Sequence, residues 1–478
     1  MKRSHSCLAI FCTILAMTSS LTTPVCANSA QSMWTGTTST GAIVTDEACP
    51  IVVESELLTF DIQEFPLQHY SKADEFFSYS GRVTAEYSFY NPADYTVEAT
   101  LVFPFGAVPD YGYLYDFDTD ENIWNTDTEK YDICVNGEPV SKELRHTFIF
   151  WGDQFNLEED IVKLYESYME DSFYSPELPV TKYTYFASDV DIETYDAATA
   201  AFVLSADATK TKVFMENQCG GATLDEGVRL DTWVELDEQF SVYVMGEPLA
   251  QPLDWKFYDN GGCENEISGK MNLVSTEKIT LKDFVLSKYD ERYGVLDYDW
   301  YNAVVTSMKY FEWTNGAIHS TEVNLDVSGQ LMRWYQYDIT LEPGERIVNT
   351  VTAPMYPSFD TNYEPPIYEY TYLLSPAQTW AEFGNLDIVV NTPYYMTKSG
   401  PEGFERSGSG YEVHLDGLPE GEFTFTLCTE ADPAAPSYED PIMGIMAGVG
   451  LVTVIAVVVV IVRRKRKRTK FVQSAVNR

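Results

Sequence analysis

A stretch of 21 residues without a charged side chain, 442–462, comes near the end of the chain, and six basic residues follow it directly. A helix of this length spans about 32 Å, since each residue adds about 1.5 Å, and the hydrocarbon core of a bilayer is about 30 Å thick. The positive-inside rule places the basic residues in the cytoplasm. These six are Arg463, Arg464, Lys465, Arg466, Lys467 and Arg468. The sequence therefore predicts a cell-membrane protein with one transmembrane helix, a basic cytoplasmic tail at 463–478 and an N-terminus outside the cell.

The start of the chain is typical of an exported protein. Two basic residues precede an apolar run at 7–17, and residues suited to cleavage end at Ala27. This pattern predicts a signal peptide at 1–27. The alternative is a lipoprotein signal in which Cys26 is lipidated, and Val25 disfavours it because a smaller residue is expected before such a cysteine.

The predicted ectodomain, residues 28–441, is strongly acidic. It retains 21 of the 31 basic residues against all 73 acidic ones, which gives a formal charge of −52. Such a surface repels nucleic acid and anionic lipid, so we expect no nucleic-acid partner. The charge fits the general solubility of exported proteins better than a dedicated role in binding cations.

Alternation of apolar and polar residues runs through much of the ectodomain and predicts antiparallel β-strands. The clearest example is the pair of runs at 83–90 and 97–103, which we expect the turn at 91–95 to join into a hairpin. The run at 132–134 and the Asn136-Gly137 turn predict another hairpin. Apolar residues at helical spacing predict one amphipathic helix near 157–173. These features together predict a first β-rich domain at 49–250.

The rest of the ectodomain is less uniform. Helical periodicity at 281–289 and 300–311 predicts two helices, whereas alternation resumes at 335–341 with turn residues at 342–345 that indicate another hairpin. Further short alternating runs are typical of a β-sandwich. The remaining predicted segments are a flexible leader at 28–48, a mixed helical connector at 251–320, a second β-sandwich-like domain at 321–428 and a Pro-rich linker at 429–441. The expected fold is mainly β, with two β-sandwich-like ectodomains, a few helices and one C-terminal transmembrane helix.

The run at 83–92 and the strand end at 101–105 carry a resemblance. Their strand, Asn turn and Phe-Pro ending resembles uncharacterised secreted bacterial surface proteins that have a single C-terminal membrane anchor. The run is also similar to the opening of the vault/inter-alpha-trypsin β domain. The resemblance implies Ig-like or vault-like β domains, and the family pattern carries no catalytic residues.

Five cysteines remain after removal of the predicted signal peptide, and an odd number leaves at least one thiol unpaired within the chain. Cys219 and Cys263 lie in matching glycine-rich turns and are the pair that we expect to form a disulfide. The alternative is that all five are isolated buried thiols.

One acidic run has the alternate oxygen ligands that calcium prefers. Asp116, Asp118 and Asp120 fit the first positions of an EF-hand loop, but Glu121 and Asp127 stand where the pattern requires Gly and Glu. Calcium is therefore the one cofactor that the sequence raises, and a solvated acidic loop is the alternative.

Catalytic motifs are missing from the sequence. Four scattered histidines without a GxSxG motif do not indicate a nucleophilic hydrolase, and HExxH is absent. Paired carboxylates, which glycosidases need, arise by chance among 73 acidic residues and specify nothing.

The expected role is therefore non-catalytic, as an interaction or structural protein at the cell surface. The partners that we expect are the bilayer and, as an assembly subunit, another envelope or membrane protein. Gly444 and Gly448 form a GxxxG spacing that would let two membrane helices approach as a homodimer. The alternative is an extracytoplasmic hydrolase or a carbohydrate-binding protein that acts on cell-wall or extracellular glycans.

Overall fold

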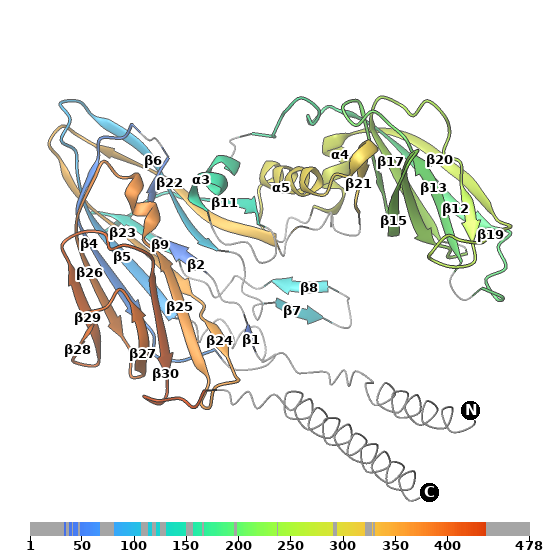
Figure 1. Ribbon diagram of the computed structural model, residues 1–478. Coiled ribbons are helices and arrows are strands. Elements are labelled where there is room, and N and C mark those ends of the chain that lie inside the picture. The colour runs from blue at the N-terminus through green and yellow to red at the C-terminus, as the bar shows by residue number, and fades with distance from the viewer. Residues whose placement is uncertain are drawn as a thin grey trace, which may run out of the picture.

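The computed structural model of the protein describes residues 33–34, 38–40, 42–45, 48–66, 81–106, 113–116, 121–124, 131–149, 156–164, 167–195, 198–236, 238–289, 294–320, 327 and 330–435. Strands make up most of its regular structure, which confirms the mainly β prediction. Two lobes lie on either side of a central helix, α5 (Asp297–Tyr310) (Figure 1). The first lobe contains both the early and the late strands of the chain. The inserted lobe contains the strands between residues 179 and 318.

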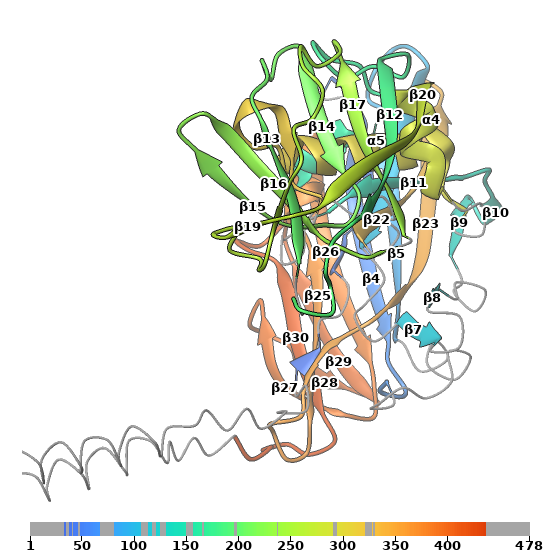
Figure 2. The same cartoon turned by 90° about the vertical axis from the view of Figure 1, so that its right-hand side faces the viewer.

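The first lobe is built from two layers of sheet that face each other across one apolar core. One layer is an eight-stranded sheet, whose long strands β4, β5 and β23 run side by side (Figure 2). In order across this sheet its strands are β10 (Glu138–Pro139), β9 (Asp132–Val135), β23 (Arg346–Met355), β5 (Gly81–Tyr90), β4 (Val52–Asp61), β26 (Glu382–Asn391), β29 (Gly410–Leu415) and β28 (Glu405–Ser407). Alternate residues of these strands enter the core, as the period of two predicts.

Two smaller sheets form the facing layer. The six-stranded sheet has β1 (Met33–Trp34), β24 (Ser358–Asp360), β25 (Ile367–Leu373), β30 (Phe423–Cys428) and β27 (Tyr395–Gly400), with β2 (Thr38–Thr40) paired to β25. The four-stranded sheet has β11 (Glu143–Phe148), β22 (Leu331–Leu341), β6 (Val97–Gly106) and β3 (Ile43–Val44). A separate hairpin pairs β7 (Tyr113–Asp116) with β8 (Glu121–Trp124), and a short 3-10 helix, η8 (Ser375–Thr379), follows β25.

The two predicted hairpins at 91–95 and 342–345 are wrong, although their strands exist. β5 lies in the eight-stranded sheet and β6 in the four-stranded sheet, so the turn at 91–95 carries the chain across the core instead of between neighbours. The turn at 342–345 does the same for β22 and β23. Alternation could not distinguish the two arrangements, because each strand buries one face toward the same core in either case. The hairpin predicted around Asn136-Gly137 is confirmed by the pairing of β9 with β10.

Two five-stranded sheets form the inserted lobe. The first has β20 (Lys270–Thr280), β12 (Pro179–Ser188), β17 (Gln239–Gly246), β14 (Thr211–Met215) and β21 (Ala317–Ile318). The second has β15 (Gln218–Leu224), β16 (Gly227–Trp233), β13 (Thr199–Leu204), β18 (Lys256–Tyr258) and β19 (Glu266–Ile267). Apolar side chains from both sheets, Phe202 and Val242 among them, share one core cluster.

Short helices close the inserted lobe, and both predicted helical regions at 281–289 and 300–311 are confirmed. They are α4 (Leu281–Val285), η4 (Leu286–Lys288), α5 and the 3-10 turn η6 (Thr314–Gly316). α4 begins with a capping box, in which Thr280 Oγ1 accepts from Asp283 N at 3.1 Å and Asp283 Oδ2 accepts from Thr280 N at 3.0 Å. These contacts satisfy backbone donors that the first turn would otherwise leave free.

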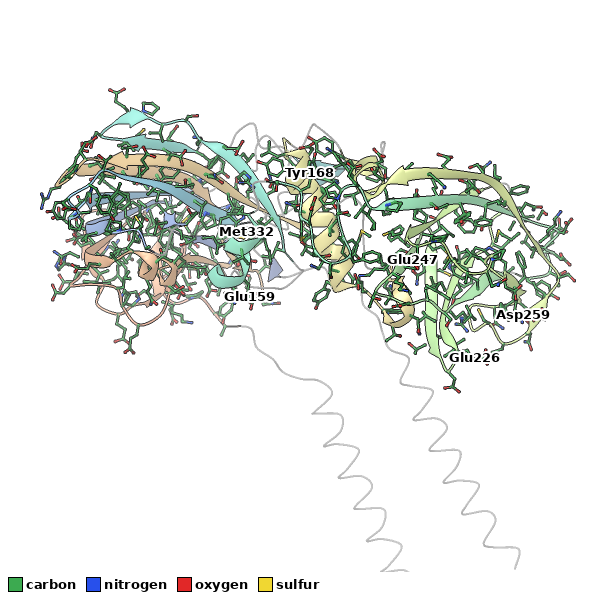
Figure 3. All side chains as sticks on the ribbon, turned by 90° about the horizontal axis from the view of Figure 1, so that it is seen from above. Glu159, Tyr168, Glu226, Glu247, Asp259 and Met332 are labelled. Carbon is green, nitrogen blue, oxygen red and sulfur yellow. The ribbon has the colours of Figure 1, made fainter. Side chains whose placement is uncertain are left out.

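The helix predicted near 157–173 is much shorter than expected. It comprises α3 (Leu157–Asp160) and the 3-10 turn η3 (Ile161–Lys163). The apolar residues that suggested one helix belong to two cores, because Ile161 packs beside Trp334 of the first lobe whereas Met169 enters the core around α5. The chain has to leave the helix to pass from one core to the other. Figure 3 shows Tyr168, within this crossing, between the lobes, with Glu226 and Asp259 at the far end of the inserted lobe.

A buried ion pair joins the lobes. Arg145 of β11 contacts Asp299 of α5 through two hydrogen bonds of 3.1 and 3.2 Å, and both side chains are 1% exposed. Asp299 also accepts from the backbone N of His146 at 2.8 Å, and Gln336 accepts from Arg145 at 2.7 Å. Burial raises the pKa of Asp299 to about 6, although Arg145 offsets part of that rise.

The sheet pairing cuts across the predicted domain boundaries at 250 and 321. β26 lies parallel to β4 and β23 pairs with β5, so strands more than 250 residues apart share a sheet. Local periodicity carries no information on such partners.

Among the described residues, no helix combines the length and the apolar character needed to cross a bilayer. The predicted signal peptide at 1–27, the helix at 442–462 and the tail at 463–478 lie outside those residues.

Candidate functional site

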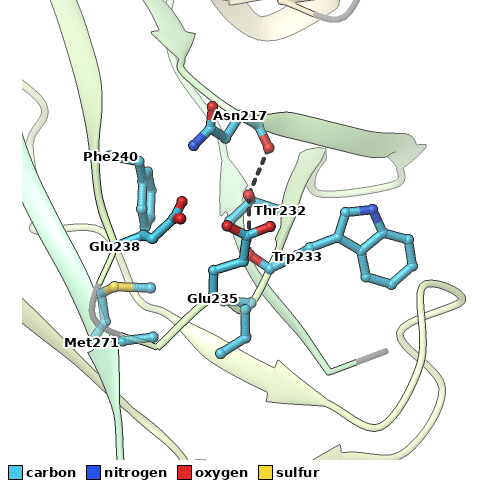
Figure 4. A pocket seen from close by; sticks show the side chains of 10 residues that line it. Asn217, Thr232, Trp233, Glu235, Glu238, Phe240 and Met271 are labelled. Carbon is cyan, nitrogen blue, oxygen red and sulfur yellow. Dashed lines mark hydrogen bonds between the residues drawn. The ribbon is translucent and has the colours of Figure 1, made fainter. Parts of the chain in front are cut away.

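A cavity of about 230 Å³ opens between the two sheets of the inserted lobe (Figure 4). β12, β17 and β20 supply one wall, and β13 and β16 supply the other. Its lining residues are Ala187, Ala200, Asn217, Thr232, Trp233, Val234, Glu235, Glu238, Phe240 and Met271. The lining therefore combines apolar side chains with four polar ones, those of Asn217, Thr232, Glu235 and Glu238.

The segment after β16 forms the rim of the cavity because it is tied to both sheets. Val234 N donates to Ala198 O at 2.8 Å, and Leu236 forms a parallel bridge with Ala187 of β12. These ties hold Glu235 and Glu238 on either side of Leu236, with both side chains exposed at the mouth. The backbone contacts thus place two carboxylates at one opening.

The opposite rim depends on a residue with left-handed backbone. Asn217 has φ +54° directly before β15, and its carbonyl accepts from Thr232 Oγ1 at 2.6 Å. Asparagine tolerates this conformation better than most residues because its short polar side chain can bond locally. The turn brings the Asn217 amide to the cavity, where Figure 4 shows it near Glu238 and Phe240.

The two glutamates at the mouth are neighbours. Hydrogen bonding with Glu235, and then repulsion between the two negative charges, raises the pKa of Glu238. Two carboxylates at one opening attract a cation, which relieves that repulsion. The site is therefore suited to a positively charged group.

The apolar side of the cavity is aromatic. Phe240 is 8% exposed and packs at 5.7 Å from Trp255, measured between ring centroids. Figure 4 shows Glu238 beside the Phe240 ring, whereas the Trp233 indole points away from both and lies against Gly261. A ligand group at the carboxylates would therefore contact the face or edge of one ring.

The predicted site residues lie elsewhere. Asp116 is the last residue of β7, where it pairs with Glu121, but Asp118 and Asp120 lie outside the described residues. Calcium binding there stays a prediction, as does helix packing through Gly444 and Gly448, which also lie outside. Within the part of the chain that the structure describes, no three His, Cys, Asp or Glu side chains gather as metal ligands.

The two cysteines predicted to pair are free thiols in the structure. They lie near the same ion pair: Cys219 Sγ is 3.6 Å from Asp231 Oδ1, and Arg229 donates both to Asp231 and to the carbonyl of Gly262, next to Cys263. Burial, followed by the charge of Asp231, raises the pKa of Cys219 to about 12. The disulfide stays a prediction.

Sequence reasoning did not single out Glu235, Glu238 or Asn217. The acidic run at 235–238 is one of many in a chain with 73 acidic residues, so composition gave no reason to select it. The cavity depends on Ala187 and Met271 from strands distant in the sequence, and only the packing of the two sheets brings these together.

Comparisons with known proteins add little. No family model and no curated protein matches the chain. Among solved structures, one from Legionella pneumophila described as "a putative nutrient binding protein" matches at 10% identity and a TM-score of 0.34, over 83% of this chain and 72% of that chain. A likeness at that TM-score supports no argument about function.

Proposed function

We propose that the protein is a non-catalytic binding protein of the cell surface, held by a single transmembrane helix at 442–462. In this proposal the two lobes are β-sandwich-like ectodomains outside the cell, and the chain is related to the anchored bacterial surface proteins that its first strands resemble. The observation that carries the proposal is the acidic cavity of the inserted lobe. The inserted lobe and β30, the last described strand before the predicted linker, lie on opposite sides of α5 (Figure 1).

The ligand that best fits the cavity is a cationic group. Glu235 and Glu238 supply negative charge at the mouth, and the Phe240 ring supplies an apolar face that also attracts cations. The cavity volume of about 230 Å³ is smaller than the roughly 300–1,000 Å³ of common ligand pockets. It suits one ammonium or guanidinium group, such as a lysine or arginine side chain of a partner protein.

The test is calorimetric titration of the full-length protein in detergent micelles. The probe is Nα-acetyl-lysine amide, with Nα-acetyl-norleucine amide as the uncharged control. The double variant Glu235→Gln/Glu238→Gln should lower the affinity for the lysine probe at least tenfold, or about 1.4 kcal/mol. Glu226→Gln, at an exposed turn of the same lobe, should leave it unchanged. Equal binding of both probes, or no loss in the double variant, would exclude the cation site.

A second candidate is a hydrolase or carbohydrate-binding protein that acts on glycans. The observation that favours it is a carboxyl pair with one raised pKa at a cavity that contains an aromatic ring. The exposure of both carboxyls disfavours it, because the general acid of a glycosidase has its pKa raised by burial. Release of soluble sugars from wall polymer by the wild type, but not by Glu238→Gln, would replace the binding proposal with this one.

The partners proposed for the rest of the chain are the bilayer, an envelope or membrane protein, and a second copy. The copy would pack through Gly444 and Gly448, where two helices could approach closely. Cross-linking in membranes should yield a dimer that Gly444→Ile/Gly448→Ile abolishes. A dimer that persists in this variant would place the contact elsewhere.

A further inference from the structure

One short segment of the first lobe joins the two sheets of one layer, and its Ala42 and Val44 are part of the core. β2 pairs in parallel with β25 at Thr40–Leu373, and β3 pairs with β6 at Ile43–Val102. β3 is the outermost strand of its sheet, and β2 adds to the side of β25. Removing both strands would leave every other strand pairing of the two sheets intact. We call the described residues of this segment, 38–40 and 42–45, the strap.

The middle of the strap is held by two side chains, Tyr87 of β5 and Trp380, which follows η8. Ala42 N donates to Tyr87 Oη of β5 at 3.1 Å, and Trp380 Nε1 donates to Ala42 O at 3.2 Å. Beyond this point Thr45 N and Thr45 Oγ1 each lie 3.1 Å from Thr100 O. The Tyr87 hydroxyl is therefore a direct link between the strap and the core beneath it.

A buried carboxyl lies on the other side of that link. Glu56 is 2% exposed and stands opposite Tyr87 in the pairing of β4 with β5. Within the described residues, Glu56 Oε1, Thr40 Oγ1 and Tyr372 Oη are buried without a hydrogen-bond partner. A buried carboxyl with an unpaired oxygen is tolerated while it is neutral. Its burial becomes costly when it carries a charge.

We propose that the strap is sensitive to pH: it stays closed against the core while the Glu56 carboxyl is protonated and opens when that carboxyl ionises. Opening admits water to the carboxylate, because the strap covers the tyrosine hydroxyl that faces it. It also uncovers the edges of β6 and β25, whose backbone groups β3 and β2 otherwise satisfy.

The titration of Glu56 supports this mechanism. Burial raises its pKa from 4.5 to about 7. Tyr87 of β5 and Tyr372 of β25 are the titratable groups that face it among the described residues. A carboxyl with a raised pKa stabilises the closed state at low pH, and this stabilisation is lost as the pH rises from 4.5 to 7.

Hydrogen–deuterium exchange of the full-length protein in detergent micelles tests the proposal. After correction for the intrinsic exchange rate, protection of the strap should fall about 30-fold between pH 5.5 and 8.5, if Glu56 regains its ordinary pKa in the open state. Protection of 83–89 in β5 should exceed that of the strap at both pH values, because the opening is local. Equal protection of the two segments, or no loss of protection in the strap, would overturn the proposal.

Two variants test the Glu56 carboxyl and the Tyr87 hydroxyl independently. Glu56→Gln should make the protection of the strap independent of pH, whereas Glu54→Gln, on the exposed face of the same strand, should keep the wild-type profile. Tyr87→Phe should lower protection at every pH while keeping its pH dependence. If Glu56→Gln does not fold, the wild-type profile and Tyr87→Phe still decide the question, since a flat wild-type profile contradicts the mechanism.

Discussion

Asn91 Nδ2 donates a hydrogen bond of 3.0 Å to the carbonyl of Leu341, and this contact joins two turns that lie 250 residues apart in the chain. The same side chain binds Tyr95 O at 2.9 Å and accepts from Ala93 N at 2.9 Å, so it closes its own turn as well. Its backbone N donates to Glu345 O at 3.0 Å. One fully buried amide thus holds together both crossings between the facing sheets.

Replacing this amide should destabilise the first lobe strongly. Asn91→Ala leaves the buried carbonyl of Leu341 without its Asn91 donor and also removes the donor to Tyr95 O, and each lost buried partner costs about 1–3 kcal/mol. We expect a loss of about 2–4 kcal/mol in the free energy of unfolding, measured by urea denaturation. Asp94→Ala changes an exposed residue of the same turn and should cost less than about 0.5 kcal/mol. Equal effects of the two variants would contradict this role.

The ion pair between the lobes should show the cost of an isolated buried charge. Asp299→Ala leaves Arg145 buried without its carboxylate, for which about 3–5 kcal/mol of destabilisation is expected. Glu54→Ala, which removes the exposed partner of Arg346, should cost at most about 1 kcal/mol. Differential scanning calorimetry measures both. A loss for Asp299→Ala no larger than that for Glu54→Ala would show that the junction does not depend on this pair.

Stability of the first lobe should fall between pH 4.5 and 7. Because the pKa of Glu56 is raised to about 7 in the folded state, the folded protein binds a proton there that the unfolded chain has released. Glu56→Gln should therefore be more stable than the wild type at pH 8, by at most about 3 kcal/mol, and about equal to it at pH 4.5. Urea denaturation at both values checks this. A constant difference between the two proteins would rule the linkage out.

Cys219 and Cys263 should form their disulfide slowly at neutral pH. Oxidised glutathione would accept the two electrons, and each thiol would lose its proton, but the raised pKa of Cys219 keeps its thiolate scarce. Asp231→Asn should speed the reaction because it removes the negative charge beside Cys219. Peptide mapping without reductant measures the linked pair. Linkage of either cysteine to Cys49, Cys134 or Cys428 instead would contradict the pairing.

Some features of the fold could be predicted because they depend on neighbouring residues. The alternation at 83–89 identifies β5 and its buried face, Asn136-Gly137 predicts the turn between β9 and β10, and the spacing at 300–311 predicts α5. Each of these signals is carried by side chains within a few residues of one another. The same reasoning overestimated the helix near 157–173, because its apolar residues enter two different cores.

The candidate site could not be predicted in this way. Glu235 and Glu238 are close in the sequence, but they lie at a cavity because Leu236 bridges to Ala187 of β12 and Phe240 of β17 lines the same space. The sequence contains many equivalent carboxylates, and their separation in space is set by strand partners that local patterns do not specify.

By itself the sequence determined the mainly β class, most of the strands and the acidity of the surface, since these follow from composition and from a period of two along the chain. Only the tertiary structure decided that β5 and β6 face each other across a core, that Asn91 binds Leu341, and that Glu56 lies buried beneath the strap. The physical reason is that burial and pairing between distant segments depend on which faces meet, and the free energy of that choice is summed over the whole core.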